Sequence, residues 1–297
     1  MKHTDLTVRG WRDYELLDSG GNRKLERYGE FVLVRPETQA LWPAAKPELW
    51  KRAVAEFSWN EGKGAWRKNK DMPESWEMGW DDIRFVMRLT SFKHTGIFPE
   101  QAANWEWLRE QVMRRIGAGR GGGNVKVLNL FGYTGIASIV AARRGAQVTH
   151  VDASRQSNEW ARENARLSGV PAENIRYLSD DALRFAEREV RRGSVYDGIV
   201  LDPPAFGRGA KGEIWRIEEH LPRLLAALAK IFSAKPGAFF LLNGYAAGYS
   251  PRSFRQTVEG VFPEAGKLPH AGFGELQVLE SGSERCIPSG IYVRFVR

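Results

Sequence analysis

Two short segments in the middle of the sequence combine residue types that could bind a nucleoside. Residues 131–135 read Phe-Gly-Tyr-Thr-Gly and follow an apolar run. Glycine lets the backbone approach a ligand closely, and the start of a following helix offers free N–H groups to a carboxylate. Asp152 ends the next apolar run about twenty residues later, where an acidic side chain can accept hydrogen bonds from both ribose hydroxyls. The glycine segment and Asp152 could each have a structural role instead. Glycine turns are common between strands and helices, and Asp152 or Ser154 could cap a helix.

Two more segments place acidic side chains or prolines directly after an apolar run. Asp180 and Asp181 follow the third run. A carboxylate there can accept a hydrogen bond from the exocyclic amine of adenine, and we assign that role to Asp181, although either aspartate could be a helix N-cap. Residues 202–206 read Asp-Pro-Pro-Ala-Phe. Consecutive prolines stiffen the backbone and remove N–H donors, so we expect the Asp202 carboxylate and the Pro203 carbonyl to hold the substrate.

The sequence also predicts the elements that bring these segments together. From residue 124 onward, short apolar runs alternate with helical patterns, which is typical of a parallel, doubly wound sheet with helices on both faces. Ligands of such sheets bind beyond the carboxyl ends of the strands. The predicted strands are residues 126–131, 147–152, 175–179, 196–202 and 238–243, and the predicted helices are residues 135–144, 156–168, 182–192, 214–232 and 251–262.

The two ends of the chain complete the predicted organisation. Residues 275–279 and 291–296 are close enough to form a terminal antiparallel hairpin, since a parallel return needs a long crossover. Before residue 89, short β-like runs and seven of the eleven tryptophans predict a small β module. The predicted domains are an aromatic-rich, mostly β module (1–90), a helix from Pro99 followed by a glycine linker (91–123), and an α/β domain (124–297).

Composition limits the protein classes. No stretch approaches the roughly 20 apolar residues of a membrane helix, and the N-terminus lacks the apolar core of a signal peptide. Cys286 is the only cysteine, which excludes internal disulfides and thiolate metal clusters, so we expect no metal. We expect a cytoplasmic protein with no membrane association. The net charge of +8 either favours polyanionic partners such as RNA or serves solubility alone.

Four motifs resemble those of a known family. Residues 131–135, 151–154 (Val-Asp-Ala-Ser) and 202–206 are similar to motifs of bacterial methyltransferases that modify large-subunit ribosomal RNA at cytosine C5 or guanine N7. Residues 95–101 (Thr-Gly-Ile-Phe-Pro-Glu-Gln) resemble the segment that those enzymes close over the cofactor. The resemblance covers residues 92–297 and implies a class I, S-adenosylmethionine-dependent methyltransferase. Its Rossmann-like sheet would be mostly parallel and seven-stranded.

The resemblance also implies roles for individual residues. Phe98 and Gln101 would lie beside the methionine or adenosyl part of S-adenosyl-L-methionine, and the two glycines of the loop would lie at the methionine. Asp202 would lie at the transfer site. Relatives often have an arginine after the glutamine, whereas this chain has Ala102. The predicted cofactor-binding residues are Phe98, Gln101, Phe131, Gly132, Thr134, Gly135, Asp152, Ala153, Ser154, Asp180, Asp181, Ala182 and Asp202.

The sequence argues against one part of the relatives' chemistry. Methylation of a pyrimidine carbon needs covalent attack by a cysteine thiolate, and such cysteines follow the fourth or fifth strand. Here those places hold Pro203 and Asn243 with their neighbours, while Cys286 is expected to be a small buried residue of the late hairpin. We therefore expect transfer to a nitrogen or oxygen, with Asp202 and Pro203 as the catalytic residues.

A base within folded RNA must leave its stack and be held by aromatic faces. Phe206, Tyr245 and Tyr249 could hold it, and Arg208 and Lys211 lie in a basic loop suited to phosphate. Each of these residues could instead pack in the core or a loop. Residues 63–70 mix lysine, arginine and tryptophan, and we favour a hairpin with tryptophan inside and lysine outside over an RNA surface there.

Three other functions compete with an RNA methyltransferase acting on ribosomal RNA. The first is a methyltransferase for a protein or small metabolite. The second is a nicotinamide-dependent oxidoreductase, which the missing G-x-G-x-x-G fingerprint argues against. The third is a non-catalytic RNA-binding relative, because fold and function separate easily.

Overall fold

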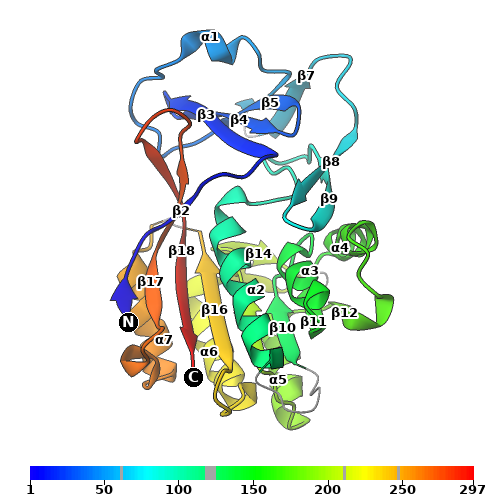
Figure 1. Cartoon of the computed structure of the whole chain (residues 1–297), viewed down its shortest axis with the longest axis vertical. Coiled ribbons are helices and arrows are strands. Elements are labelled where there is room, and N and C mark those ends of the chain that lie inside the picture. Colours follow the sequence, from blue (N-terminus) through cyan, green and yellow to red (C-terminus); the bar gives the residue numbers. More distant parts are fainter. Residues whose placement is uncertain (61–62, 118–124, 210–211, 246–247) are drawn as a thin grey trace. The chain divides into compact units, whose positions relative to one another are not determined.

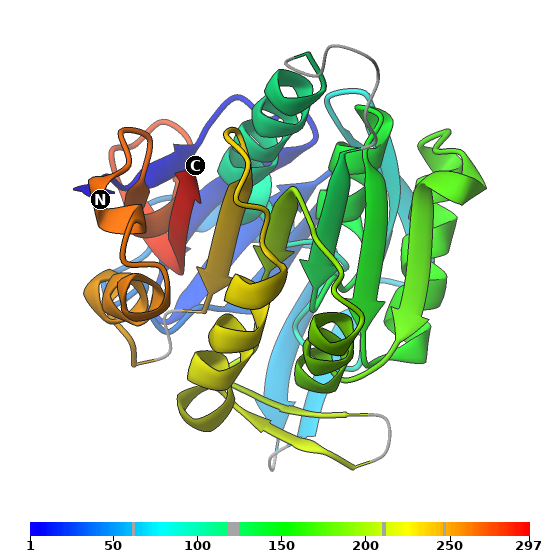
Figure 2. The same cartoon turned by 90° about the horizontal axis from the view of Figure 1, so that it is seen from below.

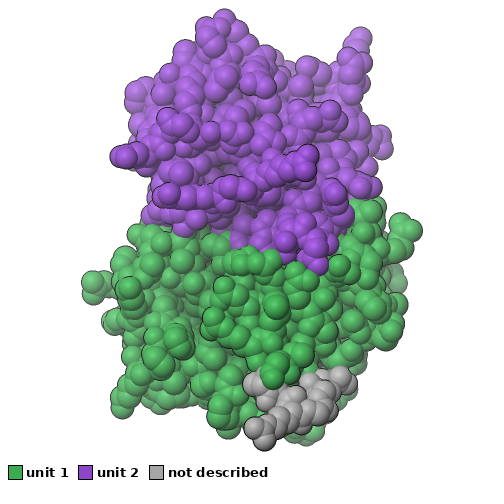
Figure 3. All heavy atoms as spheres, viewed as in Figure 1, with its two compact units in different colours: residues 1–6, 103–276, 289–297 green, residues 7–102, 277–288 purple. Residues whose placement is uncertain are grey.

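The chain divides into two compact units, which Figure 3 colours separately. The computed structural model describes residues 1–60, 63–117, 125–209, 212–245 and 248–297. Unit 1 comprises Met1–Leu6, Ala103–Leu276 and Ser289–Arg297, and unit 2 comprises Thr7–Ala102 and Gln277–Pro288. Both units are thus discontinuous, whereas the sequence predicted three consecutive segments. The predicted domains, as independently folding pieces, stay a prediction.

A mostly parallel sheet forms the centre of unit 1 (Figure 1). Its strand order is β1-β17-β18-β16-β13-β10-β11-β12, with β2 also paired to β17. The five strands from β16 to β12 run parallel, and β18 is antiparallel to β16. The bounds are β1 (Lys2–His3), β2 (Leu6–Val8), β10 (Lys126–Leu130), β11 (Gln147–Asp152), β12 (Ile175–Ser179), β13 (Gly198–Leu201), β16 (Phe239–Gly244), β17 (Gly272–Leu279) and β18 (Cys286–Val296). The predicted Rossmann-like sheet with a terminal hairpin is confirmed, but among the described residues it has nine strands instead of the expected seven, because β1 and β2 from the first residues also pair with β17.

Helices cover both faces of this sheet. The first three helices of unit 1 lie on one face and the last three on the other, as the view of Figure 2 shows. Their bounds are α2 (Ala102–Gly117), α3 (Ile136–Arg143), α4 (Arg155–Leu167), α5 (Ala182–Arg191), α6 (Ile217–Ile231) and α7 (Pro251–Val261), with single 3₁₀ turns at Ala172–Asn174 and Ala265–Lys267. Three of them begin at a capping side chain that accepts a backbone N–H, namely Ser154, Asp181 and Ser250.

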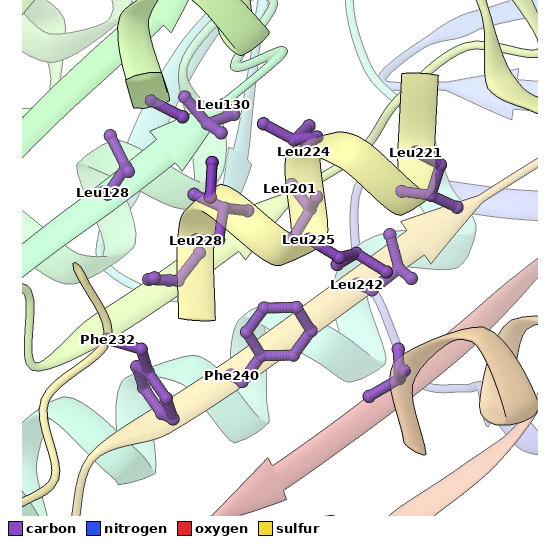
Figure 4. Packing of buried hydrophobic residues seen from close by; sticks show 14 of the residues in the cluster. Leu128, Leu130, Leu201, Leu221, Leu224, Leu225, Leu228, Phe232, Phe240 and Leu242 are labelled. Atoms are coloured by element: carbon purple, nitrogen blue, oxygen red, sulfur yellow. The ribbon is translucent and has the colours of Figure 1, made fainter. Parts of the chain in front are cut away.

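The main hydrophobic core of unit 1 lies between the sheet and helices α5, α6 and α7. Alternate residues of the strands, such as Leu128, Leu201 and Phe240, point into it, while leucines of α6 point down from the helix (Figure 4). Every residue of β16 is buried, which explains its continuous apolar sequence. The aromatic ring of Phe240 stacks on Phe295, with their ring centroids 5.2 Å apart. This packing fixes the carboxyl ends of the strands, where the candidate site lies.

The predicted helix 214–232 begins three residues too early. Ile214–Arg216 is a strand (β15) that pairs antiparallel with β14 (Phe206–Arg208), and α6 starts at Ile217. The reason is a tertiary contact that the sequence pattern does not carry. The buried Trp215 indole donates to the Pro204 carbonyl at 2.6 Å, which draws the chain back along β14. The loop expected at 206–212 is therefore partly a strand.

Unit 2 is mostly β-structure, as predicted. Five strands form one sheet in the order β3-β4-β5-β6-β7, and β8 and β9 form a separate pair. The bounds are β3 (Tyr14–Gly20), β4 (Arg23–Tyr28), β5 (Phe31–Pro36), β6 (Ala55–Asn60), β7 (Lys63–Lys68), β8 (Ser75–Trp80) and β9 (Ile83–Arg88), with helix α1 (Pro47–Trp50) and a 3₁₀ turn at Pro99–Gln101.

A buried charge cluster ties the tip of the C-terminal hairpin into unit 2. The Glu280 carboxylate is fully buried and accepts hydrogen bonds from the Ser19 hydroxyl at 2.7 Å and the Arg285 guanidinium at 2.6 Å. The same guanidinium donates to Asp18, another fully buried carboxylate, at 3.0 Å. Buried carboxylates need such partners, because an unpaired buried charge costs several kcal/mol. No pattern in the sequence predicted that these distant segments of the chain meet.

In the described part of the chain, no helix combines the length and apolar character needed to cross a membrane.

The Phe240→Ala variant tests the core. Removing this fully buried ring leaves a cavity among Phe232, Phe262 and Phe295, so the free energy of unfolding should fall by about 3–5 kcal/mol. Met113→Ala, at a side chain that is 55% exposed, is the control and should change it by less than about 0.5 kcal/mol. Urea unfolding of both variants measures the difference, and equal stabilities would contradict the described core.

Candidate active site

The loop between β10 and α3 makes a tight turn with unusual backbone angles. Phe131 and Tyr133 have φ angles of +55° and +49°, and Gly135, which precedes the helix, has a φ of +84°. Residues other than glycine adopt such angles at an energetic cost, and strained backbone of this kind concentrates at functional sites. The Gly132 N–H donates to the Val151 carbonyl at 3.2 Å, so the loop is held against β11.

A buried histidine explains why position 132 is a glycine. A Cβ atom at Gly132 would lie 2.3 Å from Cε1 of His150, a distance that no real contact shows. His150 Nδ1 lies 2.9 Å from the Ser138 hydroxyl, which accepts from the Asn129 amide at 2.8 Å. Burial lowers the pKa of His150 to about 3, so the ring is neutral. This polar support beneath the loop was missed in the sequence, where the only sign was a histidine inside an apolar strand.

Asp152 connects the loop to the next helix. One carboxylate oxygen accepts the Tyr133 N–H at 2.9 Å and the other accepts the Ser154 N–H at 2.8 Å. Burial raises the pKa of Asp152, and these two hydrogen bonds oppose the shift. The carboxylate is therefore fixed in position at the carboxyl end of β11. The hydroxyl of Ser154 caps α4 by accepting the Ser157 N–H at 3.1 Å, and Ala153 lies between the two.

Asn158, which the sequence analysis did not single out, joins the ends of two strands. Its side-chain amide donates to the Asp152 carbonyl at 3.0 Å and to the Ser179 hydroxyl at 3.0 Å. A buried asparagine that spans two strands in this way fixes the spacing between their carboxyl ends. The only signal in the sequence was a polar residue on the inner face of a helical pattern.

The aspartates after β12 have helix-terminal contacts. Asp181 is the N-cap of α5 and accepts the Arg184 N–H at 2.9 Å, with Ala182 as the first helical residue. Asp180 accepts the Asp181 N–H at 2.9 Å and forms an ion pair with Arg188. The capping alternative considered for Asp181 is thus present in the structure, and a role toward adenine stays a prediction.

The proline segment continues the same edge of the sheet. The Asp202 N–H donates to the Leu130 carbonyl at 3.3 Å, which places Asp202 next to the start of the glycine loop. The ring of Phe131 packs on Trp215, with centroids 4.8 Å apart, and Trp215 in turn binds the Pro204 carbonyl. Among the described residues, the carbonyl of Pro203 accepts no hydrogen bond, so it can accept one from a substrate.

The predicted residues therefore fall into two groups. Most follow β10, β11, β12 or β13 at one edge of the sheet, namely Phe131, Gly132, Thr134, Gly135, Asp152, Ala153, Ser154, Asp180, Asp181, Ala182, Asp202 and Pro203. Phe98 and Gln101 belong instead to unit 2, where Gln101 ends the 3₁₀ turn. For these two the role toward the cofactor stays a prediction.

The predicted substrate residues lie on later segments of unit 1. Phe206 and Arg208 are exposed on β14, and Tyr245 directly follows β16. The Tyr249 hydroxyl donates to the Glu218 carboxylate, which raises the pKa of Tyr249 and lowers that of Glu218. Lys211 lies outside the described residues.

A buried amide chain that the sequence analysis missed supports the end of β16. The Asn104 amide donates to Oδ1 of Asn243 at 2.7 Å, and the Arg294 guanidinium donates to Oδ1 of Asn104 at 3.2 Å. The Arg294 guanidinium lies over the Trp107 ring, 5.2 Å from its centroid, which is within the roughly 6 Å reach of a cation–π contact. Asn243 is therefore held in one orientation at the carboxyl end of its strand.

Comparison with known proteins identifies the class of this site. Residues 51–271 match the S-adenosylmethionine-dependent methyltransferase family. The chain belongs to this family. The predicted enzyme class and donor, S-adenosyl-L-methionine, are confirmed. Because the family match covers both the glycine loop and the proline segment, the edge of the sheet described above is the candidate active site of a methyltransferase.

Individual relatives support this assignment. A crystal structure of an S-adenosylmethionine-dependent methyltransferase from Agrobacterium tumefaciens is similar over 99% of this chain and 93% of its own, with 40% identity and a TM-score of 0.89. A methyltransferase structure from Streptococcus mutans (19% identity, TM-score 0.72, 96% of this chain and 75% of its own) shares the fold.

Curated relatives match a smaller part. Ribosomal RNA large subunit methyltransferases K/L from Shewanella frigidimarina and Shewanella baltica are 29% and 33% identical to this chain. The matches cover 60% and 59% of this chain but only 23% and 22% of those proteins. The chain thus spans less than a quarter of the curated relatives it matches.

The residues of this methyltransferase fit its donor. The strained loop packs directly over His150, which only a glycine at position 132 allows, and the Asp152 carboxylate is fixed at the adjacent strand end. His150 beneath the loop is buried in its neutral form, so it adds no positive charge at this end of the strands. In the described residues, no group of three or more His, Cys, Asp or Glu side chains is arranged to hold a metal ion.

The low pKa of His150 predicts a pH dependence of stability. The folded protein resists protonation of this ring until the pH approaches 3, whereas the unfolded chain takes up the proton near pH 6.5. The contribution of His150 to the free energy of unfolding is therefore fully present above pH 6.5. It falls as the pH is lowered, and the loss amounts to roughly 3 kcal/mol at pH 4. In urea unfolding, the free energy of unfolding of wild type should fall from pH 7 to pH 4 more than that of His150→Gln. The difference in stability between the two proteins should therefore narrow. A difference in unfolding free energy that stays constant with pH would mean that the ring is not buried in its neutral form.

Proposed function

We propose that this methyltransferase modifies a base of ribosomal RNA at a nitrogen or oxygen atom, without a cysteine nucleophile. The RNA acceptor is supported by the K/L relatives, which are methyltransferases of large-subunit ribosomal RNA, and by the net charge of +8. A positive surface favours polyanions through release of bound counterions. A cytoplasmic location is part of this proposal and rests on composition alone.

The state of Cys286 is the observation that carries the acceptor chemistry. This single cysteine belongs to the hairpin tip in unit 2, whereas β13 is followed by Asp202 and Pro203 and β16 by Tyr245. It is partly buried rather than buried, which corrects the expectation from sequence. Burial raises the pKa of its thiol, so the thiolate needed for attack on a pyrimidine ring is disfavoured.

Transfer to a nitrogen or oxygen requires that the acceptor atom be oriented toward the methyl group of the donor. When bound, the donor supplies a methyl group already activated on a sulfonium. The Pro203 carbonyl, with no hydrogen-bond donor among the described residues, would accept a hydrogen bond from an amino or ring nitrogen, and the Asp202 carboxylate would orient it. Trp215 fixes the neighbouring Pro204 carbonyl, so the segment is rigid. Alignment of this kind can lower a barrier by about 7–11 kcal/mol.

We assign the rest of the proposed site by position. Asp152 would bind the ribose, Asp181 the adenine, and the glycine loop the methionine part. The resemblance to ribosomal RNA methyltransferases implies that Phe98 and Gln101 also contact the donor. The flipped base would be held by aromatic side chains and the phosphates by basic ones. The proposed substrate residues are Phe206, Arg208, Lys211, Tyr245 and Tyr249.

The Asp152→Ala variant tests the donor site. Loss of two charge-assisted hydrogen bonds to the ribose should weaken binding of S-adenosyl-L-methionine by about 2 kcal/mol or more. Calorimetry with the donor measures this, and Asp71→Ala, an exposed acidic residue of unit 2, is the control. Because Asp152 also accepts two backbone N–H groups, circular dichroism must show that the variant is folded. A folded variant with unchanged affinity would remove the ribose assignment.

Deletion of the gene tests the acceptor. Mass spectrometry of ribosomal RNA should reveal one modification that is lost on deletion and restored by wild type. Asp202→Ala should fail to restore it, while Cys286→Ala should restore it fully because its thiol takes no part. Restoration that needs Cys286 would establish covalent chemistry instead. An unchanged set of RNA modifications, with methyl transfer to protein or metabolite fractions, would reject the RNA acceptor.

A further inference from the structure

The hairpin of β6 and β7 in unit 2 exposes aromatic rings. Phe57 pairs with Trp66 across the two strands and Trp59 pairs with Gly64, so all four lie on one face. Phe57 is buried, and the rings of Trp59 and Trp66 stand edge-on to it at 5.2 Å and 5.4 Å. Trp59 nevertheless remains 53% exposed. The sequence favoured a hairpin with Trp66 inside, and Trp66 is half-buried, while the exposure of Trp59 was not predicted.

A neighbouring turn adds a second exposed ring beside the half-buried Trp66. The Trp66 indole donates to the Phe92 carbonyl at 3.0 Å, and the Thr90 hydroxyl accepts the Phe92 N–H at 3.2 Å. Phe92 is 62% exposed. Single exposed apolar residues are common, but adjacent exposed rings on a backbone held by hydrogen bonds are typical of binding sites. We call Trp59, Trp66 and Phe92, together with the lysines described next, the hairpin surface.

The charges around these rings are strongly positive. Residues 51–70 contain six lysines or arginines and two glutamates. One of the two, Glu56, is already neutralised by Arg23 at 3.2 Å and Arg67 at 2.6 Å. Lys63, Lys68 and Lys70 are exposed, and none of them forms an ion pair with any residue that the structure describes. Lys68 pairs with Ala55, which puts it on the same face as Trp66.

A purely structural explanation accounts for only part of this pattern. β7 is an edge strand, and lysines on edge strands prevent pairing with other chains. That explains Lys63 and Lys68 but not an exposed Trp59, because an exposed aromatic ring promotes the association that the lysines prevent. Exposed rings beside unpaired cations instead match what single-stranded nucleic acid needs, since bases stack on aromatic faces and phosphates are neutralised by cations.

We propose that the hairpin surface binds a single-stranded segment of the RNA substrate, with Trp59 as a stacking platform and Lys68 and Lys70 at the phosphates. The proposal rests on the proposed function in that the acceptor is RNA. It assigns unit 2 the task of substrate capture, in addition to the chemistry of unit 1. Duplex RNA should bind less tightly, because its bases are already stacked on each other.

The test is fluorescence anisotropy of the full chain with a labelled single-stranded RNA of about 20 nucleotides, compared with a duplex of the same sequence. Trp59→Ala should weaken single-strand binding roughly fivefold or more, because one stacked base is lost. Lys68→Ala should weaken it as well and reduce the slope of log affinity against log salt by about 0.7. Leu41→Ala, an exposed apolar residue of unit 2, and Lys230→Ala, an exposed lysine of unit 1, are the matched controls and should bind as wild type does.

Two further measurements separate this proposal from the proposed function. Calorimetry with S-adenosyl-L-methionine should give the same affinity for Trp59→Ala and wild type, which also shows that the variant is folded. Methyl transfer to RNA from the deletion strain should be slower at limiting RNA for Trp59→Ala and approach the wild-type rate at saturation. Transfer to RNA that is identical for wild type, Trp59→Ala and Lys68→Ala would overturn the hairpin surface and leave the proposed function intact. Sedimentation of these variants with phosphatidylglycerol vesicles covers the lipid alternative, and loss of vesicle binding with unchanged RNA binding would overturn it too.

Discussion

The candidate site depends on the two hydrogen bonds that the Asp152 carboxylate accepts. Its two oxygens accept N–H groups from the glycine loop and from the start of α4, so one side chain fixes two neighbouring segments. Burial raises the pKa of this acid, and the two hydrogen bonds favour its charged form. The parallel register beneath it, with Leu130 between Val151 and Leu201, brings the ends of three strands together. The candidate donor site lies at this edge.

Polar groups buried under the loop and behind the strands maintain the alignment. The Asn129, Ser138 and His150 chain lies on the face of α3, and Asn158 joins β11 to β12. A buried polar network stabilises the fold only when its members have their hydrogen-bond partners, so each side chain constrains the position of the others. Hydrophobic packing on the opposite face of the sheet holds the strands together. The two amides and the neutral imidazole hold the carboxyl ends of the strands in position.

The fold was predictable from sequence to the extent that local patterns determine it. The strands β11 and β12 match their predicted ranges, because short apolar runs between helices leave little alternative. Contacts between distant segments were not predictable, and they produced the errors. Trp215 reaches back to Pro204 and converts a helix start into a strand, and Trp66, expected inside its hairpin, is only half-buried. At the site, residue types at strand ends were visible in the sequence, whereas supporting groups such as Asn158 and Asn104 carry no motif.

The discontinuity of the two units has a consequence for the order of folding. Unit 2 needs the tip of the C-terminal hairpin, where Glu280 and Arg285 meet Ser19 and Asp18, and unit 1 needs β1 at the N-terminus beside β17. On the ribosome, the first hundred residues therefore emerge with buried carboxylate Asp18 lacking its arginine partner. Neither unit can reach its final structure until almost the entire chain has been synthesised. Truncation at the C-terminus should consequently damage both units together.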